Sequence, residues 1–353
     1  MFFERIRKIH NPEGVSCTPI VDYDKCSGCQ RCYLVCPAGA YEWVDKRPKP
    51  VFAMDFGEGG PQSPCMGCRD CIASCSENAI TIQGSLIITK GAYRTPFQHR
   101  EIRSPQPLGP GRDYEDVVDE LTEIEKVIYR RRSNRAFKKK PVPRELIQRI
   151  VEAARYAPTA GNCQPVRFIV IEDRALINEI RDSVVRILDM LQKSYVEGNA
   201  VIRFFLRIYG LFKPGEIDIR PIYGARAFVD PNNKLDLFHH APCLILVLGD
   251  RRGVGKYQLD CGIASEHIVL TAHSLGLGSC YVGLIEPINL IPGLLKKLGV
   301  EYPYKVVSSI VLGYPKFKQD REVPREVTPI KWFHSRTPIP EKAGRDIEGE
   351  EEE

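Results

Sequence analysis

Eight of the thirteen cysteines of this chain fall into two copies of one spacing, Cys-x2-Cys-x2-Cys-x3-Cys. The members of the two copies are Cys26, Cys29, Cys32 and Cys36, followed by Cys65, Cys68, Cys71 and Cys75. A four-iron cluster needs four thiolates, and spacers of two residues let three successive cysteines surround one cluster. The pattern therefore predicts two [4Fe-4S] clusters, and hence a protein that carries single electrons.

A structural zinc site is the alternative, because zinc also binds paired Cys-x2-Cys units. Zinc sites rarely need a third cysteine at the same spacing and then a fourth, and this pattern occurs twice here. Each copy also continues into a similar string, at 37–41 and 76–80, which indicates an internal duplication. The copies differ where Pro37 is replaced by Ser76. That serine either donates a hydrogen bond to a cluster sulfur, which would raise the cluster's potential, or merely relaxes the turn.

The cysteine region resembles the bacterial two-cluster ferredoxins, in which the fourth cysteine of each run ligates the other cluster. The resemblance implies one cluster on Cys26, Cys29, Cys32 and Cys75, and a second on Cys36, Cys65, Cys68 and Cys71. Cys17 lies outside both runs, and we expect it to be a small packed side chain.

A second group of polar residues could bind an anion and a ring. Three arginines flank a serine, and guanidinium groups bind phosphate through two hydrogen bonds at once. A turn at 157–165 then carries two amides, which both donate and accept hydrogen bonds, as the rim of a flavin ring requires. The residues are Arg131, Arg132, Ser133, Arg135, Asn162 and Gln164. The alternative for the arginines is a solvated basic helix end beside the lysines at 138–140.

These strings resemble the nitroreductase-like FMN-dependent oxidoreductases over about residues 125–325, with further similar segments at 260–264, 275–283 and 311–315. The resemblance implies an α+β fold: a three-layer α/β/α sandwich with a mainly antiparallel sheet, following the ferredoxin-like two-cluster domain. It also implies an intertwined homodimer with FMN at the subunit interface.

The resemblance carries roles to individual positions. Arg131, Arg132, Ser133 and Arg135 would hold the FMN phosphate and ribityl chain, and Asn162 and Gln164 the isoalloxazine edge. Tyr281, Val282 and Gly283 match the segment near the flavin N5, and Arg321 matches, on a loose alignment, a late phosphate-binding arginine. We assign no general acid; Glu266 and Glu286 are the two carboxylates considered. No G-x-G-x-x-G is present, so a Rossmann site for nicotinamide is unsupported.

The 353 residues suit two domains. We predict a two-cluster domain at 17–90, a linker rich in proline and glycine at 91–122, an FMN domain at 123–320 and a tail at 321–353 that ends in an acidic run. In the second domain, helical spacing begins near 115, with Val118, Leu121, Ile124 and Ile128 on one face, and strands then alternate with helices. An insertion at 194–238 is expected to form a lid or a dimer contact, with a membrane-surface helix as the alternative.

The net charge of +5 comes without a base-reading motif, so we expect no nucleic-acid partner. The first residues lack a signal-peptide pattern and no stretch is apolar enough to span a membrane, so we expect a cytoplasmic protein. The interpretation is a ferredoxin fused to a flavin reductase, which accepts electrons from a donor such as external ferredoxin and reduces a nitroaromatic, quinone, activated alkene or halogenated aromatic. Two alternatives stay open: an electron-transfer adaptor or redox sensor without its own substrate, and electron flow in the reverse direction.

Overall fold

The computed structural model of the chain describes residues 14–52, 62–84, 87–88, 102–109, 111–193, 201, 205, 208, 228–229, 235–253, 255–319, 321–327 and 333. Most of the predicted insertion at 194–238 and all of the acidic run at 346–353 lie outside these residues.

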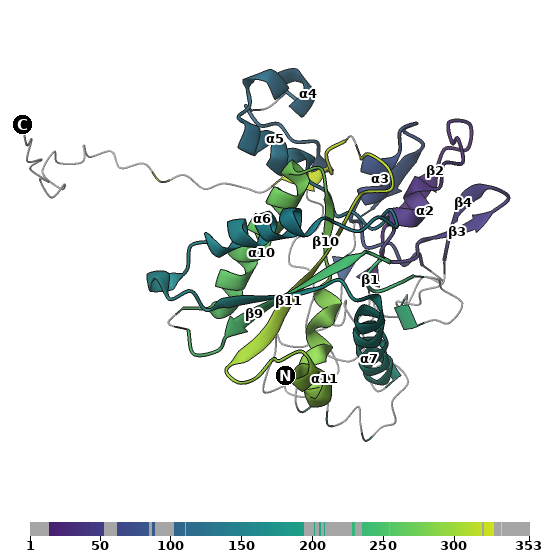
Figure 1. Ribbon diagram of the computed structural model, residues 1–353. Coiled ribbons are helices and arrows are strands. Elements are labelled where there is room, and N and C mark those ends of the chain that lie inside the picture. The colour runs from purple at the N-terminus through teal and green to yellow at the C-terminus, as the bar shows by residue number, and fades with distance from the viewer. Residues whose placement is uncertain are drawn as a thin grey trace, which may run out of the picture.

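A four-stranded antiparallel sheet forms the centre of the larger domain, in the order β10 (Gly278–Tyr281), β11 (Tyr304–Gly313), β9 (Cys243–Asp250) and β8 (Val166–Ile171). Strand β9 lies between two neighbours and is buried on both faces, which explains why its sequence is apolar without interruption. The sheet runs through the middle of the molecule, with helices on both sides (Figure 1).

Each face of the sheet has its own helical layer and its own core. On one face, α6 (Arg144–Arg155) and α10 (Tyr257–Ser274) pack against Ile245 and Val247. On the other face, α7 (Arg174–Gln192), the 3-10 helix η4 (Gly283–Leu290) and α11 (Pro292–Lys297) pack against Leu244 and Leu246. This alternation along β9 produces the three-layer α/β/α sandwich, and it confirms the predicted fold class.

The cysteine-rich domain is built from two similar halves and lies to one side of the sheet (purple in Figure 1). Each half contains a short helix, α2 (Arg31–Val35) or α3 (Asp70–Ser74). The paired strands are β2 (Thr18–Val21) with β5 (Ile80–Gln83), β3 (Tyr41–Val44) with β4 (Arg47–Pro50), and β1 (Gly14–Val15) with β6 (Ile87–Ile88).

Backbone conformation repeats between the halves. Gly28 and Gly67 have φ of 71° and 70°, and the residues that precede the helices, Gln30 and Arg69, have φ of 68° and 60°. Corresponding positions therefore take the same left-handed turns, which supports the predicted duplication.

The helical pattern near 115–130 is divided, contrary to the expectation of one helix. It forms α4 (Tyr114–Val117), the 3-10 turn η1 (Val118–Glu120) and α5 (Glu123–Arg130). The second helix starts afresh because Thr122 and Glu125 form a capping box. As a result Leu121 is buried, but Ile124 and Ile128 are 72% and 49% exposed instead of facing inward.

The segments before and after the larger domain pair with each other, as β7 (Ile102–Arg103) and β12 (Arg325–Glu326). The predicted linker and the predicted tail thus meet in one small sheet, while the domain boundaries themselves stay predictions. Among the described residues, no helix has the length and apolar character needed to cross a bilayer.

Candidate functional site

The first predicted cluster site is a cavity that gathers cysteines from both halves of the duplicated domain. Cys26, Cys29 and Cys32 line it together with Cys75. Burial, together with the charges of the neighbouring Cys29, Cys75 and Cys26, raises the pKa of Cys32 to about 12. Four sulfur atoms that face one space, and whose negative charges would repel each other, fit a cationic iron core that binds thiolates.

The second set of cysteines is brought together in the same way. Burial raises the pKa of Cys36 and Cys71, and the charges of neighbouring cysteines in this set, Cys65 and Cys68 among them, act in the same direction. A hydrogen bond with Cys17 and burial raise the pKa of Cys65. Cys17 is buried, as expected, and its side chain lies against Cys65 of this set.

Thiolates that bind four separate irons are spread around a cluster, whereas the ligands of one ion converge on a point. Within the residues that the structure describes, no three His, Cys, Asp or Glu side chains converge in a way that would hold a single metal ion. Each set brings together four cysteines, which is the number of thiolates that a four-iron cluster needs.

Backbone amides point at the sulfur of the fourth cysteine in each run. The Ala40 N–H donates to Cys36 Sγ at 3.2 Å, and the Ala79 N–H donates to Cys75 Sγ at 3.3 Å. The Ser76 hydroxyl donates to the Glu77 carboxylate at 2.9 Å and not to a sulfur, so the simpler interpretation of the Pro-to-Ser difference holds.

A basic cavity lies in the larger domain, next to the β7 and β12 pair. Its charged lining consists of four arginines and one carboxylate: Arg103, Arg131, Arg132, Arg325 and Glu266. This excess of positive charge in a concave site is suited to an anion such as a phosphate.

Arg132 is the most informative of these residues. It is only 4% exposed, and its Nη1 donates to the carbonyl oxygens of Tyr129 and Arg131 at 2.9 and 2.8 Å. Its Nε and Nη2 are buried with no hydrogen-bond partner. Burial lowers the pKa of Arg132 to about 10. A buried guanidinium with two unpaired donors is costly, and an anion in the cavity would satisfy both the charge and the donors.

Glu266 connects this cavity to the end of β10. Its carboxylate lies 3.7 Å from Arg131 Nε and accepts a hydrogen bond from the Tyr281 hydroxyl at 3.1 Å. Val282 is buried and Gly283 is exposed at the start of η4. The predicted N5 segment therefore adjoins the basic cavity, whereas Glu286 lies elsewhere on the surface of η4 and does not line it.

Two of the predicted phosphate ligands contact the cysteine-rich domain. Arg135 forms a buried ion pair with Asp70, and Arg321 Nη2 donates to the Ser76 carbonyl at 3.1 Å. Neither lines the basic cavity. Ser133 forms a β-bridge with Ser279 beside β10 and is also outside the lining.

The two predicted amides lie apart from the arginines. Asn162 and Gln164 are exposed, with φ of 52° and 49°, and neither lines the basic cavity. The Gln164 amide donates to the Asn162 carbonyl at 3.4 Å.

Two arginines of the cavity, Arg103 and Arg325, were not predicted from the sequence. Arg325 follows Pro324 in a segment where the alignment was loose, and Arg103 lies in what the composition indicated to be a linker. The sequence does show a basic residue in each segment that flanks the larger domain. Only the pairing of β7 with β12, however, places Arg103 and Arg325 together at the cavity.

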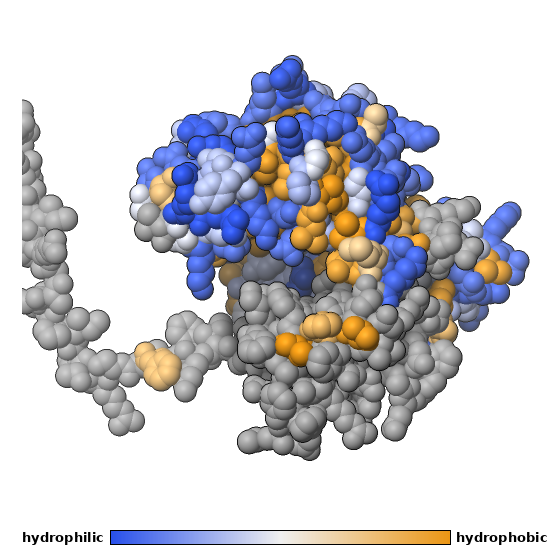
Figure 2. Space-filling view, turned by 90° about the horizontal axis from the view of Figure 1, so that it is seen from below, coloured by the Kyte–Doolittle hydropathy of each residue, from blue (hydrophilic) through white to orange (hydrophobic). Residues whose placement is uncertain are grey.

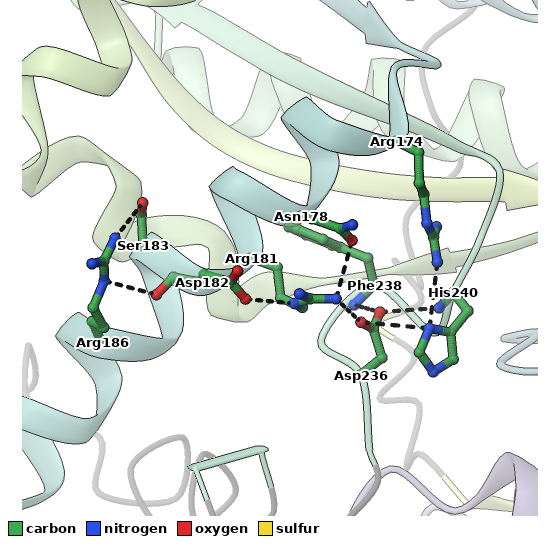
Figure 3. A network of polar contacts seen from close by, with 9 residues as sticks. All are labelled: Arg174, Asn178, Arg181, Asp182, Ser183, Arg186, Asp236, Phe238 and His240. Carbon is green, nitrogen blue, oxygen red and sulfur yellow. Dashed lines mark hydrogen bonds and ion pairs between the residues drawn. The ribbon is translucent and has the colours of Figure 1, made fainter.

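An ion-pair network joins α7 to the turn that follows Asp236 (Figure 3). Asp236 accepts from Arg181 at 2.9 Å and from the backbone N–H groups of Phe238 and His240 at 3.0 Å. The network holds His239 at a φ of 55°. Burial and the charge of the nearby Arg135 lower the pKa of His239 to about 3, so this side chain is neutral.

Comparison with known proteins gives independent evidence for both regions. Residues 25–81 match the 4Fe-4S dicluster domain, and residues 128–314 match the nitroreductase family. A protein of Archaeoglobus fulgidus, provisionally named NADH dehydrogenase/NAD(P)H nitroreductase, is 27% identical over 205 residues, which are 57% of this chain and 90% of that protein. An uncharacterized ferredoxin of Methanocaldococcus jannaschii is 39% identical over 64 residues, 18% of this chain and 75% of the ferredoxin.

A nitroreductase of Desulfitobacterium hafniense, solved with bound FMN, has a TM-score of 0.43 and 29% identity, covering 60% of this chain and 100% of that chain. The region matched by the nitroreductase family takes up more than half of this chain and contains the whole four-stranded sheet. Together with the dicluster match around both cysteine runs, this shows that the chain belongs to the nitroreductase family of oxidoreductases, with an iron-sulfur domain at its N-terminal side.

Proposed function

We propose that this protein passes electrons from two [4Fe-4S] clusters to FMN and from FMN to an organic acceptor. The observation that carries the proposal is the buried Arg132, whose two unpaired donors lie beside a cavity with three further arginines, in a chain that also holds two complete cysteine sets. When bound, FMN accepts electrons one at a time and delivers them in pairs, so it would join a one-electron carrier to a two-electron reduction.

Different residues of the chain would bind the phosphate group and the ring of FMN. Arg131, Arg132, Arg103 and Arg325 surround the position proposed for the phosphate group. Glu266 holds both Arg131 and Tyr281, and so orients the phosphate site relative to the end of β10. Val282 and Gly283 then lie where the resemblance implies that a backbone N–H approaches the flavin ring.

We also propose that the protein is a homodimer, with Asn162 and Gln164 reaching the flavin from the other subunit. Both amides are exposed and outside the basic cavity of their own chain. In addition, Ile124, Ile128 and Leu259 are exposed apolar side chains on α5 and α10, two helices that contact each other. Figure 2 views the molecule from below, away from α5, and shows further hydrophobic side chains in several places among hydrophilic ones. Exposed apolar area of this kind is typical of interaction surfaces.

The acceptor class is to be determined by an anaerobic screen. The protein, confirmed to contain iron and FMN, is reduced with a reduced ferredoxin as donor, and reoxidation of the flavin is recorded with a nitroaromatic, a quinone, an activated alkene and a halogenated aromatic. We expect a nitroaromatic to reoxidise the flavin with stoichiometric loss of acceptor. If the protein as purified holds no FMN, the proposal is wrong.

The second candidate function is an adaptor or redox sensor, in which the flavin only relays electrons between proteins. The exposed position of Tyr281 beside the cavity, 37% exposed, is the observation that favours an accessible flavin edge. The same screen separates the two functions. An adaptor would reoxidise with a protein acceptor and would leave all four classes of small molecule unreduced.

A further inference from the structure

Arg135, a residue of the larger domain, contacts both cysteine runs at the positions where they contribute to the second set. Arg135 forms an ion pair with Asp70, the residue immediately before Cys71, and both side chains are buried, at 13% and 7% exposed. The same guanidinium donates to the carbonyl of Val35, the residue immediately before Cys36, at 3.4 Å. Because Cys36 and Cys71 come from different halves of the duplicated domain, Arg135 lies where the two halves complete this set.

The segment that carries Arg135 is fixed within the larger domain. The residues around it form β-bridges, Ser133 with Ser279 and Phe137 with Pro315. Between them, the Asn134 N–H donates to the Ser279 carbonyl at 2.8 Å, and the Ser279 N–H donates to Asn134 Oδ1 at 3.2 Å. The segment of Arg135 is thus an additional edge of the sheet beside β10, the strand that leads to Tyr281 and the basic cavity.

The larger domain contacts the first cysteine set only beside Cys75, as far as the described residues show. Every residue that lines its cavity lies between 26 and 80, inside the cysteine-rich region, and Cys29 is exposed. The larger domain does contact the flanks of Cys75, through Gln319 to Ser74 at 2.7 Å and Arg321 to Ser76. These contacts dock the helix α3, but none of them puts a charge into the lining of the first cavity.

We infer that the cluster bound by Cys36, Cys65, Cys68 and Cys71 is the one that exchanges electrons with the flavin, and that Arg135 is the positioning residue that docks it. The cluster on Cys26, Cys29, Cys32 and Cys75 is then the entry point for electrons from outside. The inference rests on the proposed function for the direction of transfer, but the placement of Arg135 beside one cluster does not.

The electron balance of the route is simple. A reduced ferredoxin-type protein supplies two electrons in succession at the exposed first site, and each passes through the second site. When bound, FMN would take up two electrons and one proton, and the clusters held by the two cysteine sets would return to the oxidation state in which they began. The acceptor then takes the electron pair with protons from water.

The charges beside the second set provide the test. A nearby positive charge favours the more negative, reduced form of a cluster, and a nearby negative charge disfavours it. Arg135→Gln should therefore lower the midpoint potential of one cluster, and Asp70→Asn should raise the midpoint potential of the same cluster. The potential of the other cluster should not move in either variant. EPR-monitored redox titration of the anaerobic holoprotein measures both potentials.

Two further variants make the assignment unambiguous. Cys29→Ala removes a ligand of the first cluster only, so the signal that it loses identifies that cluster. Arg135→Lys keeps the charge and should leave both potentials near their wild-type values. We also expect flavin reduction after flash photoreduction of the clusters to slow at least tenfold in Arg135→Gln, with the iron and FMN contents unchanged.

Several results would overturn the inference. Shifts of the same sign in Arg135→Gln and Asp70→Asn would indicate general loosening of the site, and shifts confined to the cluster lost in Cys29→Ala would reverse the order of the two clusters. Loss of FMN from Arg135→Gln with both potentials unchanged would make Arg135 a flavin ligand instead. If the wild-type protein binds no FMN, the proposed function fails, while the opposite shifts of one cluster would still establish the position of Arg135.

Discussion

Arg103 lies directly opposite Arg325 across the two-stranded sheet of β7 and β12. Like charges in this position destabilise a strand pair unless something between them compensates. Both residues line the basic cavity with Arg131 and Arg132, so a bound anion would be shared by four guanidinium groups. A bound anion would therefore strengthen the pairing of the two segments that flank the larger domain.

This relationship predicts that Arg325→Ala weakens FMN binding by about tenfold to a hundredfold, because a charge-assisted hydrogen bond contributes about 1.5–3 kcal/mol. Titration of apoprotein with FMN, followed by quenching of flavin fluorescence, measures the change. Arg321→Ala is the matched control, since Arg321 contacts the Ser76 carbonyl outside the cavity. Equal losses in both variants would contradict the placement of the phosphate.

Arg132 leads to a second prediction, because its buried Nε and Nη2 have no partner without an anion. Arg132→Met keeps much of the volume but removes the charge, so FMN affinity should fall at least tenfold and the iron content should stay the same. Added FMN should also raise the melting temperature of the wild type much more than that of the variant. An unchanged FMN-dependent shift in melting temperature would show that the anion binds elsewhere.

The sequence was sufficient for the parts of the molecule in which spacing determines geometry. The two cysteine runs and the alternating faces of β9 follow from local rules, and the structure has both features. The crossed ligand sets came from the resemblance to two-cluster ferredoxins and stay a prediction. The partners of Arg135 and Arg321 were harder to predict. An arginine side chain is long, so the group that it contacts depends on the tertiary structure. Asp70 and Ser76, which these arginines contact, lie in the other domain and could not be paired with them by spacing. The break between α4 and α5 was missed because the apolar period continues through the capping box at Thr122.

Gly67 and Gly28 offer a test of the two cluster sites separately. A Cβ on Gly67 would lie 2.8 Å from Cys17 Sγ, which packs against Cys65, and a Cβ on Gly28 would lie 2.8 Å from the Lys46 carbonyl. Both glycines also have positive φ, which costs another residue about 1–2 kcal/mol. We expect Gly67→Ala to lose the second cluster and Gly28→Ala the first.

Iron analysis and EPR measure this outcome, with about four irons lost in each variant. Gly84→Ala is the control, because Gly84 has a φ of 78° but its Cβ would come no closer than 3.9 Å to another atom. If Gly84→Ala loses as much iron as the other two variants, the strain of the backbone and not the collision is responsible.

The neutral His239 predicts a dependence of stability on pH. Its folded pKa of about 3 is far below the ordinary value of about 6.5. Desolvation and the positive charges of Arg135 and His240 lower this pKa, while Asp236 acts in the opposite direction. Below pH of about 6.5 the unfolded chain binds a proton that the folded chain excludes, so the free energy of unfolding falls as the pH decreases toward 3. The loss should approach about 1.4 kcal/mol per pH unit.

His239→Asn, which tolerates the positive φ, should remove this part of the pH dependence. The measurement is the difference in unfolding free energy between wild type and variant at about pH 6.5 and about pH 5, which cancels the contribution of the carboxylates. A difference that does not change with pH would mean that His239 is protonated in the folded protein.

Residues from before and after the sheet in the sequence hold the cysteine-rich domain: Arg135 precedes the sheet, and Gln319 and Arg321 follow it. A carrier that is held in this way does not need to find its reductase by diffusion. Internal transfer should therefore proceed at a rate that is independent of protein concentration and nearly insensitive to ionic strength, and only the arrival of the outside donor should depend on salt.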